Sequence, residues 1–309
     1  MITTLALLAS SVTPQTLEDP WVHYEGAPDL PGSGKKIVMI AGDEEYRSEE
    51  ALPALGKILS QRHGFDCTVL FSTNEETGEI DPDEQTNIPG LEMLADADLA
   101  FVFLRFRELP DEQMEHFVDY VESGRPIIGL RTATHAFNYE DDPESPYRHW
   151  TWRNKDWPGG FGKQILGETW VAHHGGHGSQ STGGVIEQEN AEHPILRGLG
   201  SDVWGPTDVY AANPPADATI LLRGAVLDGM TQEAKPVEGP KNEPMMPIAW
   251  VREVEVAEGK TARVFCSTLG AATDLQTTGS RRMYVNAAYW CVGLEDRITA
   301  DSAADLVGD

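Results

Sequence analysis

The sequence is poor in cysteine and in positive charge. It holds 3 cysteines in 309 residues, all inside apolar runs and none in a CxxC pair, so neither a disulfide framework nor a cysteine zinc site is expected. Lys and Arg number 23 against 50 Asp and Glu, which gives a net charge of −27. A field of that sign repels phosphate backbones and anionic lipids, so nucleic acid and membrane surfaces are not expected partners.

Long apolar runs are also missing. No run reaches the roughly 18 residues of a membrane span. The N-terminal stretch MITTLALLASSVTPQT resembles the apolar region of a secretory signal, although the first basic residue is Lys35. We therefore expect a leader and linker over 1–34 and an exported or periplasmic protein. A cytoplasmic protein with an apolar N-terminal tail is the alternative.

What is present is a strand–helix alternation. Apolar runs predict buried strands at 35–43, 65–72, 98–105 and 125–132, and helices at 48–64 and 110–124. This order predicts an α/β domain with a doubly wound, mostly parallel sheet of the flavodoxin type. Further strands are predicted at 183–189, 218–226, 247–256 and 261–270, with a closing helix at 280–294. We expect one domain over 35–297 and a tail over 298–309.

Polar side chains follow the predicted parallel strands. In open α/β sheets, ligands bind beyond the carboxyl ends of the strands. The candidate binding residues at these ends, and in the later PTDVY segment, are Glu45, Tyr46, Arg47, Arg105, Arg107, Arg131, His135, Asp208 and Tyr210. Each also has a structural explanation, such as negative charge at a helix start or a hydrogen-bonded buried histidine.

The stretch ETWVAHHGGHGSQST (168–182) concentrates three histidines, His173, His174 and His177. Metal binding, substrate hydrogen bonding with proton transfer, and a structural role are the three explanations. Gly175 and Gly176 indicate a loop, and adjacent histidines rarely reach one ion. We therefore predict no metal cofactor and keep the three histidines as the alternative ligand set. The loop is interpreted as a wall or lid whose imidazoles bind sugar hydroxyls.

The turn after the fourth predicted strand, GLRTA, lies where related folds carry a nucleophile elbow. Its central residue is Arg131, which is permanently charged and not nucleophilic. Covalent acyl chemistry, and with it glutamine amidotransferase activity, is therefore excluded at this elbow. We expect the Arg131 side chain to project from the sheet, so that Arg131→Ala impairs ligand binding and leaves the fold intact.

Several ordered segments carry a family resemblance: KIVMIAGDEEYRSEEALP, RFRELPDEQ, GLRTATHAFNY and RVFCSTLGAATDLQTTGSRRMYVNAAYWCVGLED. Over 35–297 the chain resembles the ThuA-like (trehalose utilisation) family. The resemblance implies a class I glutamine amidotransferase-like fold without the cysteine, and a role in carbohydrate catabolism on 3-keto-glycosides. The chain departs from the family's common pattern at Arg131, Val209 and Ala271, where relatives offer a histidine, a carboxylate and a histidine.

Two functions from different classes follow. The first is an enzyme, acting as lyase, hydrolase or isomerase on an oxidised (3-keto) glycoside. His135 would be the base, Asp208 would orient it, and Arg131 and Arg105 would stabilise the oxyanion. The second is a non-catalytic carbohydrate-binding module on a degenerate amidotransferase-like fold. A small carbohydrate is the expected partner in both, and the sequence leaves the oligomeric state open.

Overall fold

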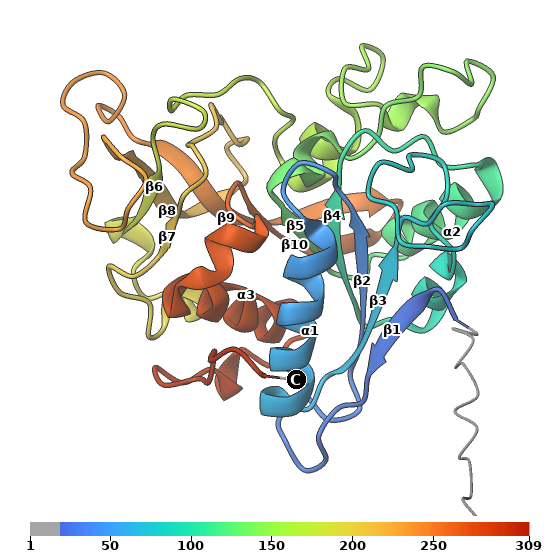
Figure 1. Ribbon diagram of the computed structural model, residues 1–309, viewed down its shortest axis with the longest axis horizontal. Coiled ribbons are helices and arrows are strands. Elements are labelled where there is room, and N and C mark those ends of the chain that lie inside the picture. Colours follow the sequence, from blue (N-terminus) through green and yellow to red (C-terminus); the bar gives the residue numbers. More distant parts are fainter. Residues whose placement is uncertain (1–18, 309) are drawn as a thin grey trace, which may run out of the picture.

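A single mixed sheet organises the molecule. The computed structural model describes residues 19–308, so the signal-like stretch predicted at the N terminus lies outside the described residues. The described strands form one ten-stranded sheet in the order β1-β3-β2-β4-β5-β10-β9-β8-β6-β7 (Figure 1). The strands are β1 (Trp21–Tyr24), β2 (Lys36–Gly42), β3 (Asp66–Phe71), β4 (Leu99–Leu104), β5 (Ile127–Leu130), β6 (Thr182–Ile186), β7 (Trp204–Gly205), β8 (Thr219–Val226), β9 (Met246–Ala257) and β10 (Lys260–Ser267).

The parallel part of the sheet follows the sequence prediction. Strands β3, β2, β4, β5 and β10 pair in parallel, with Ile40 opposite Leu70 and Val102. Every residue of β4 is buried, as expected for a strand covered on both faces. The chain passes from β3 across β2 to reach β4. The carboxyl ends of β2 and β4 therefore flank a point where the strand order reverses, the usual location of a ligand site.

The other half of the sheet corrects the prediction of a mostly parallel sheet. Strands β10, β9, β8, β6 and β7 pair antiparallel, and β1 pairs antiparallel with β3, so the sheet is mixed. Between β9 and β10 only Glu258 and Gly259 form the turn, with Gly259 at φ 66°. A parallel connection needs about a dozen residues, whereas a two-residue turn closes a hairpin. The direction of β10 relative to β9 is therefore set by this turn.

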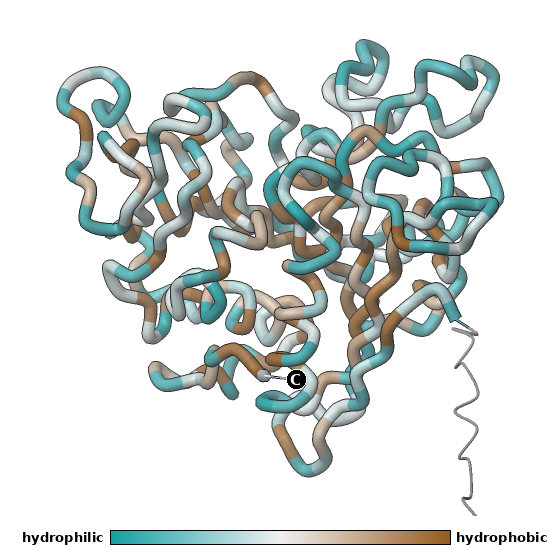
Figure 2. The backbone as a smooth tube through the Cα atoms, in the orientation of Figure 1, coloured by the Kyte–Doolittle hydropathy of each residue, from teal (hydrophilic) through white to brown (hydrophobic). Residues whose placement is uncertain are grey.

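Helices cover both faces of the sheet. Helices α1 (Ser48–His63) and α3 (Thr278–Cys291) contribute to one apolar cluster, and α2 (Asp111–Glu122) belongs to the cluster on the other face. The hydropathy view shows the apolar strands between them (Figure 2). The remaining helical turns are short: η1 (Leu91–Asp96), η2 (Arg131–His135), η3 (Arg148–Trp150), η4 (Gly162–Leu166), η5 (Gln188–Asn190), η6 (Pro194–Leu196), η7 (Ala272–Gln276) and η8 (Glu295–Arg297).

Both ends of the described chain are packed against the domain. Strand β1 lies in a stretch interpreted from the sequence as a leader or linker; it pairs with β3 from Trp21 opposite Leu70 to Tyr24 opposite Cys67. At the other end, the carbonyl of Ala303 accepts a hydrogen bond from His63 Nε2 at 2.7 Å. Ala304 is buried as well. The segments that flank 35–297 therefore contribute packing to the same fold.

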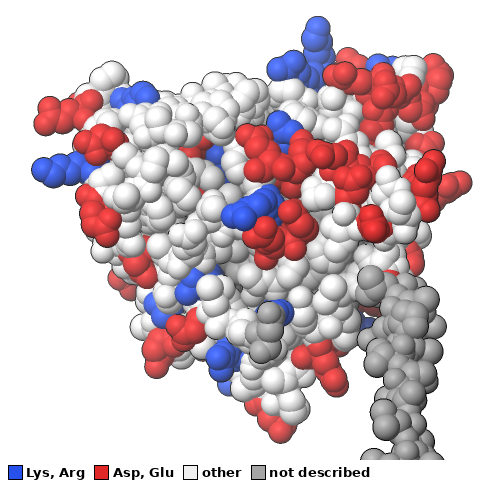
Figure 3. Space-filling model, in the orientation of Figure 1, with Lys and Arg blue, Asp and Glu red and all other residues white. Residues whose placement is uncertain are grey.

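The surface carries the acidic excess. Figure 3 shows acidic side chains gathered over the upper right of this face and along its left edge, with fewer Lys and Arg side chains scattered among them. In the part of the chain that the structure describes, no helix has the length and apolar character needed to cross a bilayer.

Candidate functional site

The turns after β2, β4 and β5 meet the 168–177 segment around a small cavity of about 160 Å³. The cavity combines a carboxylate, a guanidinium, two imidazoles and three aromatic rings. Its lining residues are Glu45, Arg105, Phe106, His135, Trp170, His173 and Tyr210. A space of this size is below the ~300 Å³ of sites for drug-sized ligands, so it suits a single small ring.

The elbow residue Arg131 lies beneath this cavity. It follows β5 directly with φ 40°, a left-handed conformation that non-glycine residues adopt rarely. Its guanidinium stacks between two tyrosine rings, 4.1 Å from the centroid of Tyr46 and 4.2 Å from that of Tyr210. One Nη1–H donates to the carbonyl of Thr268 at 2.8 Å. The side chain is fully buried and does not project from the sheet as the sequence led us to expect.

Asp208 is the centre of the polar network. One carboxylate oxygen lies 2.8 Å from His173 Nδ1, and the other lies 3.2 Å from His177 Nδ1 and 3.3 Å from Arg131 Nη2. The carboxylate is 1% exposed. Asp208 therefore orients His173 and His177 rather than His135, whose Nδ1 lies 3.1 Å from Thr134 Oγ1.

The histidine loop is held by its backbone. The N–H groups of His174 and Gly175 donate to the carbonyl of Val209 at 2.8 and 2.9 Å, and Ala211 N–H donates to Ala172 at 2.9 Å. His173 forms an antiparallel bridge with Tyr210. These bonds fix the His173 and Asp208 side chains relative to each other. His174 is directed elsewhere: its Nε2 bonds the carbonyl of Lys241 at 2.8 Å.

His135 is buried among aromatic rings. Its ring centroid lies 5.0 Å from that of Phe106 and 5.9 Å from that of Trp170. Burial, together with the positive charges of Arg105 and Arg131, holds the pKa of His135 well below its usual range near 6.5. The imidazole is therefore neutral at physiological pH and can accept a proton or a hydrogen bond.

Arg105 lies at the cavity wall between two carboxylates. Its guanidinium pairs with Glu44 and, at 3.1 Å, with Glu45. The neighbouring Arg107 is fully buried and bonds Glu44 and the carbonyls of Pro82 and Glu84. Arg107 therefore braces the 82–84 loop, and Arg105 is the cation that faces the cavity.

Asp43, in the turn after β2, is a buried hydrogen-bond acceptor. It accepts bonds from the N–H groups of Glu45 at 3.0 Å and Tyr46 at 2.5 Å, and from the Thr132 hydroxyl. Burial raises the pKa of Asp43 to about 6. This carboxylate ties the turn after β2 to the elbow and so positions both walls of the site.

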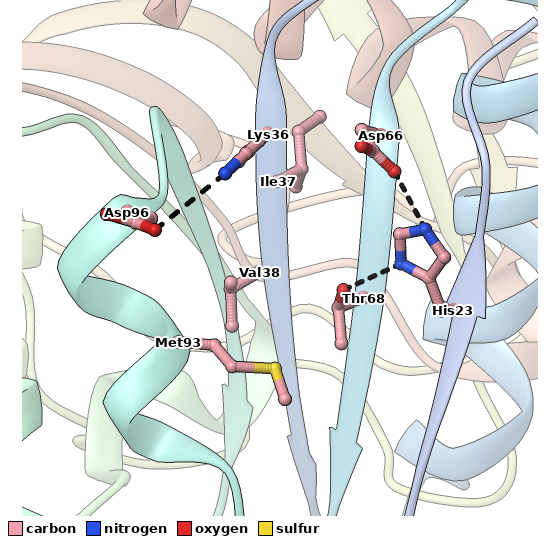
Figure 4. Close-up of a pocket in the computed structure, with 8 residues that line it drawn as sticks. All are labelled: His23, Lys36, Ile37, Val38, Asp66, Thr68, Met93 and Asp96. Atoms are coloured by element: carbon pink, nitrogen blue, oxygen red, sulfur yellow. Dashed lines mark hydrogen bonds and ion pairs between the residues drawn. The ribbon is translucent and has the colours of Figure 1, made fainter.

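Larger cavities lie elsewhere in the described part of the chain. One of about 270 Å³ opens at the amino ends of β2 and β3, where His23 lies 3.0 Å from both Asp66 and Thr68 (Figure 4). Its polar side chains are already paired, and it is at the opposite end of the parallel strands from the elbow. Another of about 500 Å³ has a largely apolar lining that includes Val171, Met245 and Met246.

A protein-family model described as "ThuA: Trehalose utilisation" matches residues 36–291. The chain belongs to the ThuA family. Two solved ThuA-like proteins share the fold. The one from Parabacteroides merdae is 15% identical with a TM-score of 0.54, covering 87% of this chain and 96% of that one. The one from Bacteroides uniformis is 16% identical with a TM-score of 0.52, covering 86% and 94%. No curated protein matches the sequence.

In this ThuA-family chain, the predicted site residues fall into three groups. Glu45, Arg105, His135, His173 and Tyr210 line the cavity. Tyr46, Arg131 and Asp208 lie beneath it as buried support, and His177 contacts Asp208 and lies 3.9 Å from Glu45. Arg47, Arg107 and His174 are directed elsewhere; Arg47 is 49% exposed and pairs with Glu50.

The sequence did not single out Phe106 as part of the ThuA-family site. Phe106 follows Arg105 with φ 53°, and this backbone conformation brings its ring into the cavity wall. Two tryptophans are also close: Trp170 lines the cavity and Trp152 packs behind it, 5.8 Å away between ring centroids. Trp150 instead packs in the core on Phe161. The many aromatic residues between positions 136 and 182 are the sequence signal for an aromatic wall that includes Trp170.

Proposed function

We propose that the elbow cavity binds one sugar unit of an oxidised (3-keto) glycoside and catalyses proton transfer beside its carbonyl group. The support is the combination of lining groups in one small cavity. Aromatic rings of Phe106 and Trp170 offer faces to sugar C–H groups, whereas His135 and His173 offer hydrogen bonds to hydroxyls. The trehalose-utilisation family description agrees with a sugar ligand.

The proton transfer uses His135 as the acceptor. A carbonyl acidifies the neighbouring C–H bond; as that bond breaks, its electron pair moves onto the carbonyl oxygen as an enolate, and the proton passes to His135. Because His135 is neutral, it is in the accepting form before the reaction. Arg105 supplies positive charge at the cavity wall for the oxyanion. Elimination, hydrolysis or isomerisation would each begin with this step.

The observation that carries the proposal is the meeting of a neutral imidazole and a guanidinium in one cavity. The test is exchange of the hydrogens next to the carbonyl of a 3-keto-glucoside in D₂O, followed by proton NMR against the buffer rate. We expect protein-dependent exchange that His135→Gln removes. Exchange at the buffer rate with the sugar bound would reject the catalytic role.

A non-catalytic carbohydrate-binding module is the second candidate. Two observations favour it: Arg105 is already paired with Glu44 and Glu45, and the elbow residue is a buried arginine instead of a nucleophile. The first leaves less positive charge to stabilise an oxyanion, and the second removes covalent catalysis at the elbow. Sugar binding without hydrogen exchange, over a range of pH and with added metals, would select this candidate.

A further inference from the structure

We infer that His173, His177 and Asp208 form a binding site for one divalent transition-metal ion of the zinc class, at the rim of the elbow cavity. The three side chains can each offer one ligand atom, and these atoms lie within 4.8 Å of one another. This inference goes beyond the proposed sugar chemistry and does not depend on it.

The spacing of the donor atoms fits a zinc coordination sphere. His173 Nδ1 and His177 Nδ1 face the two oxygens of Asp208 at 2.8 and 3.2 Å. In a tetrahedral site with bonds of about 2.0–2.2 Å, neighbouring ligand atoms lie about 3.4 Å apart. Small rotations of the two rings would therefore place both Nδ1 atoms and one carboxylate oxygen around a single ion.

The backbone already brings the ligands together. The sequence-based expectation of no metal rested on a loop too rich in glycine to hold ligands. In the structure, the Val209 carbonyl accepts hydrogen bonds from His174 and Gly175, so the loop is fastened to the segment that carries Asp208. The objection that adjacent histidines rarely reach one ion also falls, because His174 bonds Lys241 and leaves the site to His173 and His177.

The surroundings supply outer partners and an open side. Arg131 donates to Asp208 from below, and Glu45 Oε1 lies 3.9 Å from His177 Nε2, the nitrogen that a metal on Nδ1 leaves protonated. Carboxylates in this position orient ligand histidines in many metal sites. The imidazoles are 36% and 53% exposed, whereas Asp208 is 1% exposed. The ion would thus be anchored from the buried side and accessible to water or ligand from the other.

The donor set selects the kind of ion. Two imidazole nitrogens and one carboxylate favour zinc and its first-row neighbours over Mg²⁺ and Ca²⁺, which prefer oxygen ligands throughout. The positive charge of Arg131 works against affinity because it shares the Asp208 carboxylate. The net charge of −27 works in its favour, since it raises the cation concentration near the surface.

The test uses the chelator-treated full-length chain and zinc alone, followed by calorimetry, with Co²⁺ absorption as a second readout of tetrahedral nitrogen and oxygen ligation. We expect one zinc per chain in the presence of excess Mg²⁺. His177→Ala should weaken binding by more than the ~10–100-fold that loss of an outer partner costs. The exposed His177 is the safest ligand to remove, and Asp208→Asn should act in the same direction.

His174→Ala is the matched control, because it removes an imidazole from the same loop. The His174 imidazole bonds the carbonyl of Lys241 and not Asp208. It should keep the zinc affinity of the unmodified chain. Less than one zinc per chain at saturation, loss of binding in excess Mg²⁺, or equal effects of His174→Ala and His177→Ala would each overturn the inference. No sugar enters this titration, and hydrogen exchange on the chelator-treated chain tests the proposed function separately.

Discussion

The guanidinium of Arg131 lies 3.3 Å from a carboxylate oxygen of Asp208, and both side chains are excluded from water. The two residues are 77 positions apart in the chain. Their ion pair joins the elbow after β5 to the segment that fastens the histidine loop. Arg131 also stacks between Tyr46 and Tyr210, so the floor of the cavity is a single packed unit.

We predict that Arg131→Ala destabilises the fold, contrary to the expectation from the sequence. Removing one partner of a buried ion pair leaves the other charge uncompensated, at a cost of about 3–5 kcal/mol. Arg131→Ala should lower the free energy of unfolding in urea by that amount. Arg47→Ala is the control, because its exposed pair with Glu50 contributes at most about 0.5 kcal/mol. Equal stabilities of the two variants would contradict the structural role of Arg131.

The parallel half of the fold could be predicted because each strand there carries its own signal. The apolar run of β4 and the left-handed glycine that ends α1, Gly64, are local features. Strand direction is not local: the apolar pattern of β9 is the same in either orientation. Only four residues separate the strands predicted at 247–256 and 261–270, which is too short for a parallel connection. This spacing was the sequence signal for a hairpin, and β9 and β10 do pair antiparallel.

The site, like the fold, could be predicted only in the part formed by the parallel strands. Glu45, Arg105 and His135 follow neighbouring parallel strands, whose carboxyl ends must meet at one edge, and all three line the cavity. The partners of each charge could not be predicted, since they come from distant segments. Asp208 meets His173 and Arg131 only because the 172–175 and 209–211 segments pair through their backbones.

The second prediction concerns Asp43, whose pKa is raised to about 6 by burial. The folded state binds this proton more tightly than the unfolded chain does, where the pKa is near 3.9. The contribution of Asp43 to stability is therefore complete below pH 3.9 and is lost as the pH rises through 6.

Asp43→Asn mimics the protonated form and removes this dependence. The free energy of unfolding of the unmodified chain, relative to Asp43→Asn, should fall by about 1.4 kcal/mol between pH 5 and pH 7.5. Urea unfolding of both chains across this range measures it, and contributions common to both cancel in the difference. A relative stability that stays constant over this interval would show that Asp43 ionises in its ordinary range.

The third prediction tests the aromatic wall. Trp170 lines the elbow cavity, whereas Trp157 lines a separate cavity with His149 and Trp150. Trp170→Ala should weaken binding of a 3-keto-glucoside by about 1–2 kcal/mol through lost apolar contact, or about 5–30-fold. Trp157→Phe is the control and should leave the affinity unchanged. Calorimetric titration decides the matter; an equal loss in both variants would place the sugar elsewhere.

The last prediction compares two adjacent glycines in the histidine loop, neither of which has a φ in the left-handed region. A Cβ on Gly175 would lie 3.1 Å from Asp208 Cβ and from the backbone nitrogen of Val209, a contact that cannot relax without moving the loop. A Cβ on Gly176 meets the ends of the Ser179 and Gln180 side chains, which can rotate away.

Gly175→Ala should therefore separate His173 and His177 from Asp208 while the sheet stays folded, and Gly176→Ala should not. We expect zinc affinity to fall by about 10–100-fold in Gly175→Ala, comparable to the loss of an outer-shell partner, and to stay unchanged in Gly176→Ala. Circular dichroism of both variants checks the fold. Each change adds one methyl group to the same loop. A similar loss of zinc affinity in both variants would therefore show that the loop is loosened in general, and that the close approach of Gly175 to Asp208 is not the cause.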